Sequence, residues 1–269
     1  MKIGSQAHRT TAISASNAET IVVRGRDLVN DLIGAVDFTE HFWLLVTGKL
    51  PTQDQRRVLD ATLVAIAEHG LVPSVQASRM TLAAAPEAMQ GAVAAGILGC
   101  GSVVLGSSEA AGRFFAEILA KADGANLSID DAAAQVLRDY RAVKRAIPGY
   151  GHPLHKGADP RAQKLLQISR DSGTAGRHVE VALAVERHIP QIVGKALAMN
   201  VSGAIPSVLL DAGFPLGALK GVPLLARTAG LIAHLLEEQL RPIGFVMSHA
   251  AENAIGYDGE SPAGFVPGE

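Results

Sequence analysis

Residues 148–162 read PGYGHPLHKGADPRA, and this stretch decides both the expected fold and the expected site. The glycines of PGYG lack a Cβ, so the backbone there can approach a ligand closely. His152 follows directly on this constrained turn. Asp159 has the residue type of a helix N-cap, and Pro160 suits the first helical position. A helix is therefore predicted to begin here, with Arg161 in its first turn, where its guanidinium can grip a carboxylate.

On both sides of this stretch the chain is patterned for helices. Residues 53–69 place Leu59, Leu63 and Ile66 on one face, behind a start signal at 51–52. Residues 21–29 are predicted as a short strand or turn that leads into a helix. Alternating strand patterns are nearly absent and aromatic residues are only 4% of the chain, so an all-α fold is predicted. Similar helical spacing occurs near 87–99, 108–121, 130–145, 159–170, 178–189 and 221–238.

Glycine and proline clusters mark the predicted breaks between these helices. In the helix predicted at 221–238, Leu224, Leu235 and either Leu231 or Ile232 form the apolar stripe. Several breaks carry a histidine or adjoin an arginine. Helix ends expose unsatisfied backbone donors and acceptors, which suits the recognition of carboxylates and phosphates. The main breaks are 69–74, 99–107, 147–153, 200–206 and 213–223.

The composition narrows the class of protein. Hydrophobic residues make up 48% and charged residues 19%, yet no stretch approaches ~20 uninterrupted apolar residues, so a large subunit interface is expected and a membrane span is not. A net charge of −2 without a dense basic block makes nucleic acid an unexpected partner. The single cysteine, Cys100, excludes an internal disulfide framework and a multi-cysteine metal site. A cytoplasmic location is expected.

PGYGHPLHKGADPRA resembles the signature P-G-(F/Y)-G-H-x-(V/L)-x-K-x-x-D-P-R-A of the citrate synthase superfamily, which includes citryl-CoA lyases and the lyase module of ATP citrate lyase. Other segments are similar to the family's motifs in the same order. They are VRGRDLVNDLIG at 23–34, FTEHFWLLVTGKLPT at 38–52, AEHGLVPSVQASR at 67–79, ALAMNVSGAIPSVLLDAGFP at 196–215, and LLARTAGLIAHLLEE at 224–238 followed by RP at 241–242. The length is similar to that of the short, lyase-like members.

The resemblance implies an all-helical homodimer, with a large domain at 1–103 and 209–269 and a small domain at 104–208. It implies no permanently bound cofactor and no metal, with a coenzyme A thioester and a di- or tricarboxylate as ligands. His69 and His152 match positions that hydrogen-bond the oxaloacetate or citrate moiety. Arg161 and Arg227 match arginines that hold its carboxylates, and Arg241 matches an arginine that the second subunit contributes.

The same resemblance places the coenzyme A site on the turn. Its backbone matches the loop that reads the CoA adenine in the family, and Lys156 lies where it can meet a CoA phosphate or only water. The predicted cofactor-binding residues are Pro148, Gly149, Tyr150, Gly151 and Lys156.

Two positions depart from the family pattern. Asn200-Val201-Ser202 stands where the family has N-V-D, and Val104 stands where it has a histidine that polarises the thioester oxygen. Proton transfer and oxyanion stabilisation are each worth orders of magnitude in rate. His69, His152 and Ser202 are the candidate catalytic residues, and Glu68 or Glu109 are alternative bases. For Ser202, a plain helix N-cap is the competing interpretation.

Three hypotheses therefore follow from the sequence. The first is cleavage of citryl-CoA, or of a related 3-hydroxy-3-carboxyacyl-CoA, into acetyl-CoA and an oxo acid. The second is a carbon–carbon synthase or lyase that acts on a different oxo acid. The third is a non-catalytic binder of CoA or carboxylates, or a subunit that completes another enzyme.

Overall fold

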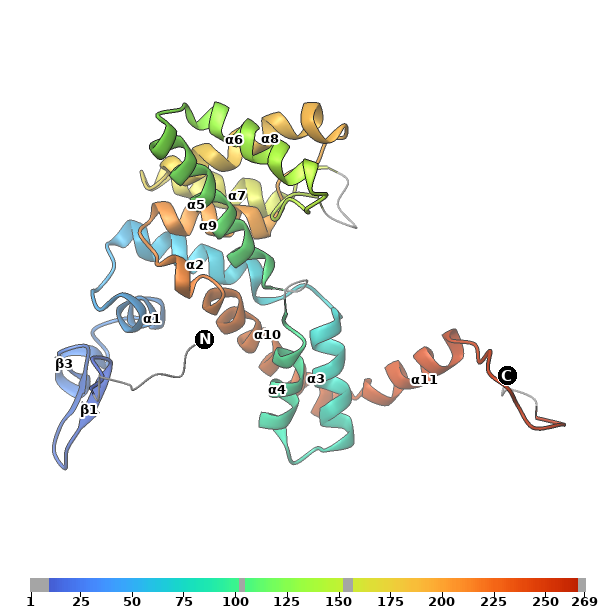
Figure 1. The fold of residues 1–269 in the computed structure, drawn as a ribbon. Coiled ribbons are helices and arrows are strands. Elements are labelled where there is room, and N and C mark those ends of the chain that lie inside the picture. Colours follow the sequence, from blue (N-terminus) through green and yellow to red (C-terminus); the bar gives the residue numbers. More distant parts are fainter. Residues whose placement is uncertain (1–9, 102–104, 152–156, 266–269) are drawn as a thin grey trace. The chain divides into compact units, whose positions relative to one another are not determined.

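The computed structural model describes residues 10–101, 105–151 and 157–265. Helices make up 64% of the chain, and the few strands form one small antiparallel sheet (Figure 1), which confirms the all-α prediction. The strands are β1 (Ser14–Ser16), β2 (Ile21–Val23) and β3 (Arg26–Asp27), followed by a single turn of π-helix, η1 (Leu28–Leu32). The predicted strand or turn at 21–29 leading into a helix is thus confirmed.

The chain divides into two compact units. Unit 1 comprises 1–62 and 108–219, and unit 2 comprises 63–107 and 220–269. These limits differ from the predicted domain boundaries. The predicted boundaries separate a large domain from a small one that closes over the ligands, and that division stays a prediction. The helices are α1 (Phe38–Thr47), α2 (Gln53–Ala67), α3 (Pro73–Ala84), α4 (Met89–Leu98), α5 (Ser107–Ala125), α6 (Ile129–Ala142), α7 (Pro160–Asp171), α8 (Arg177–Val193), α9 (Val201–Asp211), the 3-10 turn η2 (Leu216–Ala218), α10 (Gly221–Leu240) and α11 (Gly244–Ala254).

In unit 1, α8 packs against both α6 and α9, and α9 also packs against α7. The ring of Phe114 on α5 lies 4.9 Å from that of Tyr140 on α6, measured between centroids. Trp43 of α1 meets Phe214 edge to face at 5.3 Å. Aromatic pairs in such tilted geometries add to the free energy gained by burial alone. Helix α9 thus lies between α7 and α8, and its packing against both holds the two helices in one unit.

Helix α9 contradicts the predicted break at 200–206. Asn200 caps the helix, which then continues through Gly203 and Pro206 to Asp211. Proline removes one backbone hydrogen bond from a helix interior. Burial outweighs that cost, because almost every side chain from 201 to 209 is buried. The prediction failed because it relied on the local helix-breaking tendency of glycine and proline and did not include tertiary packing.

In unit 2, α3 packs against α4, α10 and α11, and α10 also packs against α4. Leu82, Ala92 and Leu235 form a buried cluster among α3, α4 and α10. Leu231 is fully buried while Ile232 is half exposed, so Leu231 belongs to the inner stripe of α10. Of the described residues, only the stretch 216–240 is long and apolar enough to cross a membrane. Core helices of globular proteins can meet the same criterion.

Candidate functional site

The PGYG turn lies against the first turn of α9 in unit 1. Gly149 has φ +87°, a conformation that other residues rarely adopt, and a Cβ there would lie 2.7 Å from the Cα of Gly203. A Cβ on Gly203 would in turn lie 2.6 Å from the carbonyl oxygen of Gly149. The backbone N–H of Asn200 donates to that same carbonyl at 3.0 Å. The glycines thus permit close backbone contact within the protein. The sequence had suggested a close approach to a ligand, which stays a prediction.

Tyr150 forms an isolated antiparallel bridge with Met199. The flanking hydrogen bonds run from Gly151 N–H to the Ala198 carbonyl and from Asn200 N–H to the Gly149 carbonyl, so the backbone N–H and C=O of Tyr150 point away from Met199. The Tyr150 side chain is buried, and its hydroxyl donates to the carbonyl of Ala182 at 2.7 Å. Its outward backbone groups suit the predicted reading of a ligand by main chain.

Asp159 is the N-cap of α7 and Pro160 its first residue, as predicted. The buried carboxylate of Asp159 accepts hydrogen bonds from Arg161, through its backbone and its guanidinium, and from the backbone N–H of Val201 at 3.0 Å. Burial alone would raise the pKa of Asp159, but these hydrogen bonds outweigh it and hold the pKa below its usual value. Arg161 is therefore paired with Asp159, its own N-cap.

The N-terminus of α9 corrects one prediction. Asn200, not Ser202, is the N-cap, because the Asn200 side-chain oxygen accepts from the backbone N–H of Ser202 at 2.9 Å. Ser202 lies in the first helical turn and is partly buried. The side-chain nitrogen Nδ2 of Asn200 donates to the carbonyl of Gly151 at 2.6 Å. Asn200 thus joins the PGYG turn to the helix start that carries Ser202.

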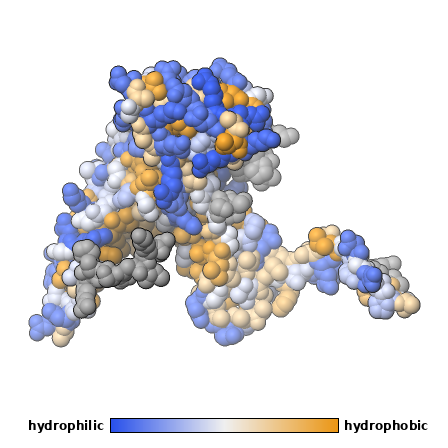
Figure 2. Space-filling model, in the orientation of Figure 1, coloured by the Kyte–Doolittle hydropathy of each residue, from blue (hydrophilic) through white to orange (hydrophobic). Residues whose placement is uncertain are grey.

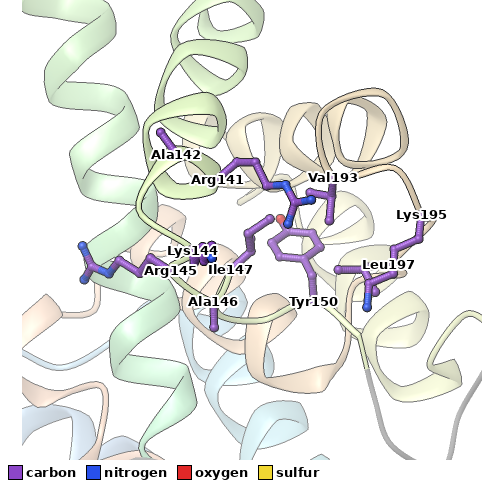
Figure 3. A pocket seen from close by; sticks show the side chains of 10 residues that line it. All are labelled: Arg141, Ala142, Lys144, Arg145, Ala146, Ile147, Tyr150, Val193, Lys195 and Leu197. Carbon is purple, nitrogen blue, oxygen red and sulfur yellow. The ribbon is translucent and has the colours of Figure 1, made fainter.

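A basic cavity of about 720 Å³ opens beside the PGYG turn, wholly within unit 1 (Figure 3). Its charged groups are all cationic, and Ile147, Val193 and Leu197 supply apolar walls. In Figure 3 the guanidinium of Arg141 lies near Tyr150, while that of Arg145 extends the other way, to a position 4.4 Å over the ring of Tyr140. The lining cations are Arg141, Lys144, Arg145 and Lys195.

The cations of this cavity were not among the predicted site residues. Three of them belong to RAVKR at 141–145, immediately before the PGYG motif, and that local concentration was the available signal. Lys144 has φ +54°, where glycine is usual, at the C-terminal end of α6. A helix C-terminus carries partial negative charge, so basic side chains are favourable there.

Arg227 of α10 is a buried arginine of unit 2 with few hydrogen-bond partners among the described residues. It is 3% exposed, and within the described residues its hydrogen bond is a long one of 3.4 Å, from Nη2 to the carbonyl of Ile66. No partner is found for its Nε and Nη1 atoms among the described residues. A buried unpaired cation is costly unless an anion joins it. At this burial Arg227 does not snorkel to solvent, and no ion pair of Arg227 is found among the described residues.

Arg79 provides the contrast within the same unit. It is 2% exposed, and it donates from Nε to Glu238 at 2.6 Å and from Nη1 to Glu237 at 2.8 Å. Its Nη2 donates to the carbonyl of Arg241. Arg79 is thus a fully paired structural cation. Arg241 itself is exposed and follows the last residue of α10, so its predicted role across a subunit interface stays a prediction.

The turn that carries His69 is held by Glu68. The Glu68 carboxylate accepts from the backbone N–H of His69 at 2.8 Å and pairs with Nε2 of His234 at 3.0 Å. Arg79 lies 3.3 Å from the other ring nitrogen of His234, and because arginine can only donate, that nitrogen accepts. Burial alone would raise the pKa of Glu68, but the hydrogen bonds from His234 and Gly70 lower it. The ionised Glu68 carboxylate therefore holds this turn in place. The side chain of His69 is exposed.

The remaining predicted residues divide into two groups. Glu109 forms an ion pair with Arg113 one turn along α5. His152, Lys156 and Val104 lie outside the described residues. In the parts of the chain that the structure describes, no group of three or more His, Cys, Asp or Glu side chains could hold a metal ion.

Comparisons with known proteins place the chain in a family. Residues 52–243 match the family model for the C-terminal domain of citrate synthase. The citryl-CoA lyase from Hydrogenobacter thermophilus is 32% identical with a TM-score of 0.84, and the match covers 96% of this chain and 97% of that one. The chain belongs to the citrate synthase family. The sequence resemblance is thus confirmed.

More distant relatives match a smaller share of their own length. The citrate/2-methylcitrate synthase of Bacillus subtilis (strain 168) is 27% identical over 208 residues, which cover 76% of this chain and 53% of that protein. The chain spans about half the length of the curated relatives it matches. An ATP citrate lyase from Methanosaeta concilii, solved in complex with (3S)-citryl-CoA, is 22% identical with a TM-score of 0.74 over 96% of this chain and 43% of that one. At that identity the likeness concerns the fold alone.

Proposed function

We propose that this protein is a citryl-CoA lyase-type enzyme, which cleaves citryl-CoA, or a related 3-hydroxy-3-carboxyacyl-CoA, into acetyl-CoA and an oxo acid. The observation that carries the proposal is the buried guanidinium of Arg227, whose Nε and Nη1 lack partners among the described residues. A substrate carboxylate supplies the acceptors that these donors need. The likeness to a citryl-CoA lyase along nearly the whole of both chains supports the same reaction.

In the proposed reaction a base removes the proton of the tertiary hydroxyl. The oxygen's electrons form the carbonyl of oxaloacetate as the adjacent carbon–carbon bond breaks. The electrons of that bond pass into the thioester as an enolate, which takes a proton on carbon to give acetyl-CoA. Atoms and charge balance without any further reactant. Arg227 would hold a carboxylate and thereby fix the orientation of the breaking bond.

The basic cavity beside the PGYG turn suits the nucleotide end of coenzyme A. The cations Arg141, Lys144 and Lys195 suit a ligand that carries several phosphate charges, and the apolar walls can hold a base or the pantetheine arm. Tyr150 of the PGYG turn lines the same cavity. We therefore propose that the cavity extends the predicted coenzyme A site at Pro148, Gly149, Tyr150 and Gly151.

Purified protein incubated with synthetic citryl-CoA tests the proposal. Oxaloacetate is followed through oxidation of NADH by added malate dehydrogenase, and acetyl-CoA by chromatography. We expect both products in equal amounts from the wild type, and none above background from Arg227→Met. A folded wild type that neither turns over citryl-CoA nor binds citrate or CoA in calorimetry would contradict the proposal.

A catalytically impaired binder is the second candidate function, because Ser202 replaces the acidic residue expected after Asn200-Val201. It predicts that CoA and citrate bind without turnover. Ser202→Asp then separates the two candidates. Cleavage that appears only in Ser202→Asp would show that the missing carboxylate was the base and would favour the binder, whereas turnover by the wild type rules the binder out.

We also propose that the functional unit is a homodimer. Ile232, Leu236 and Leu240 lie one helical turn apart on α10, and all are half to three-quarters exposed. Phe245 and Val246 at the start of α11 are exposed as well, and Figure 2 shows hydrophobic residues on the surface of unit 2. Such an apolar stripe is typical of an interface. Light scattering should give a dimer mass for the wild type and a monomer mass for Leu236→Glu.

A further inference from the structure

Basic residues recur along α10 at a constant spacing. Lys220 immediately precedes the helix, Arg227 and His234 lie within it, and Arg241 follows its last residue, each seven positions after the one before. Seven residues make nearly two turns, so successive members lie within about 20° of one helix face and about 10 Å apart along the axis. The helix therefore presents a basic row on a single face.

The members of this row differ in their partners. His234 is paired with Glu68 and is contacted by Arg79. Arg227 is buried with two unpartnered nitrogen atoms. Lys220 is partly buried, and no side-chain hydrogen bond or ion pair is found for it among the described residues. For the two neighbouring cations at the N-terminal end of the row, the described residues thus supply no counter-charge.

The environment of Lys220 and Arg227 disfavours both charges in the absence of an anion. Lys220 lies at the N-terminal end of a helix of 20 residues, where the helix dipole is positive. Burial raises the pKa of the Cys100 thiol, and the charges of Arg227 and Lys220 each lower it in part, so both charges act on the same region of unit 2. A carboxylate there would relieve the repulsion between them and satisfy Arg227.

The reach of the two side chains allows them to meet one ligand although their positions along the helix axis lie about 10 Å apart. Side chains on a helix lean toward its N-terminus, so a residue covers the surface over the turn before its own. Arg227 therefore leans toward the turn of Lys220. The lysine, on a flexible four-carbon stem at the helix end, can turn back to meet the same ligand.

We propose that Lys220 is a second cation of the Arg227 carboxylate site and makes that site selective for acids with more than one carboxylate. This inference rests on the proposed function, in which the acid is the citrate part of a citryl thioester. Arg227 would hold one carboxylate, and Lys220 a neighbouring one. Lys220 is thus a specificity-determining residue, distinct from the residues that the family resemblance assigned.

Calorimetric titration with citrate, and with acetate as a monocarboxylate probe, tests this role. Lys220→Gln removes the charge and keeps most of the side-chain length. We expect it to weaken citrate binding about tenfold, the size of effect typical of one charged hydrogen bond, and to change acetate binding much less. Lys220→Arg should restore citrate binding. Because one cation is gone, citrate binding to Lys220→Gln should also depend less on ionic strength.

Lys49→Gln is the matched control, because it removes one exposed lysine in unit 1 and should leave citrate binding unchanged. Melting curves followed by circular dichroism establish that each variant is folded. If the wild type and Lys220→Gln bind citrate equally, the inference is wrong while the proposed function stands. Equal losses for citrate and acetate would refute the selectivity. If the wild type binds neither citrate nor CoA, both the inference and the proposed function fail.

Discussion

The buried carboxylate of Asp159 accepts the backbone N–H of Val201 at 3.0 Å while it pairs with Arg161, so one side chain ties the N-terminus of α9 to that of α7. The two helix starts carry Ser202 and Arg161, both predicted site residues. A helix N-terminus is an anion-binding position by virtue of its free N–H groups. Asp159 therefore sets how two such positions are spaced within unit 1.

Replacement of Asp159 should disturb both helix starts. In Asp159→Asn the ion pair with Arg161 is lost, and an amide N–H₂ replaces one accepting oxygen. We expect the free energy of unfolding to fall by about 2–3 kcal/mol, because a buried network loses its charged member. Urea unfolding measures the change, and calorimetry should show weaker CoA binding.

Asp123→Asn is the control for this change. Asp123 pairs with Arg177, but both side chains are more than half exposed. Exposed ion pairs contribute about 0–1 kcal/mol, so this variant should unfold almost as the wild type does. Equal effects of the two substitutions would show that Asp159 is an ordinary helix cap without a bracing role.

The two buried arginines of unit 2 should respond in opposite ways to the same substitution. Arg79→Met strips Glu238 of its partner and should cost about 3 kcal/mol or more of unfolding free energy. Arg227→Met removes unpaired donors from a buried site, so the protein should be as stable as the wild type, within about 1 kcal/mol, or more stable. Citrate binding should be lost in Arg227→Met. A large loss of stability in Arg227→Met would mean that its guanidinium is paired inside the protein, against the proposed anion site.

Close contact between the PGYG turn and α9 makes Gly203 intolerant of a side chain. Gly203→Ala would place a Cβ 2.6 Å from the Gly149 carbonyl oxygen, a distance that forces the backbones apart. We expect a loss of at least about 2 kcal/mol, measured by urea unfolding. Gly124→Ala on α5 is the control, since its Cβ meets nothing within 4 Å. Alanine there should be neutral or should stabilise the helix by about 0.5–1 kcal/mol. Equal behaviour of the two variants would contradict the close contact.

Local signals predicted the parts of the fold that depend on local chemistry. Asp159 and Pro160 begin α7 as their residue types indicate, and the apolar spacing at 53–69 corresponds to α2. The prediction of 178–189 ended too early, because α8 continues through Pro190 to Val193. That proline lies in the last turn of a helix already held by packing. Such tolerance depends on contacts that no local pattern contains.

In the candidate site, too, local features could be predicted from the sequence and contacts between distant residues could not. The motif around 148–162 predicted the turn and the start of α7, and the structure joins this turn to the Asn200 cap, a contact that the sequence did not predict. The sequence could not show that Gly149 approaches Gly203, or that Nε and Nη1 of Arg227 lack partners among the described residues while Arg79 has several. Each of these depends on residues far apart in the chain.

Acid should weaken the protein through Asp211, the last residue of α9. Its carboxylate accepts from the backbone N–H groups of Gly176, His178 and Val179 and pairs with the His178 ring at 2.8 Å, so it closes the N-terminus of α8. Burial alone would raise the pKa of Asp211, but the hydrogen bonds from His178 and from the three N–H groups outweigh it and lower the pKa.

A lowered pKa in the folded state fixes the sign of the pH effect. The unfolded chain then takes up the proton more readily, so the stabilisation is complete above the ordinary aspartate pKa and is lost as the pH falls through the folded value. At pH 7, Asp211→Asn should reduce the free energy of unfolding by about 2 kcal/mol, as expected for a lost helix cap. Urea unfolding from pH 7 down to pH 3 should show the wild type approaching Asp211→Asn below about pH 4. A constant gap between the two proteins across this range would mean that the Asp211 carboxylate is not the group whose protonation weakens the fold.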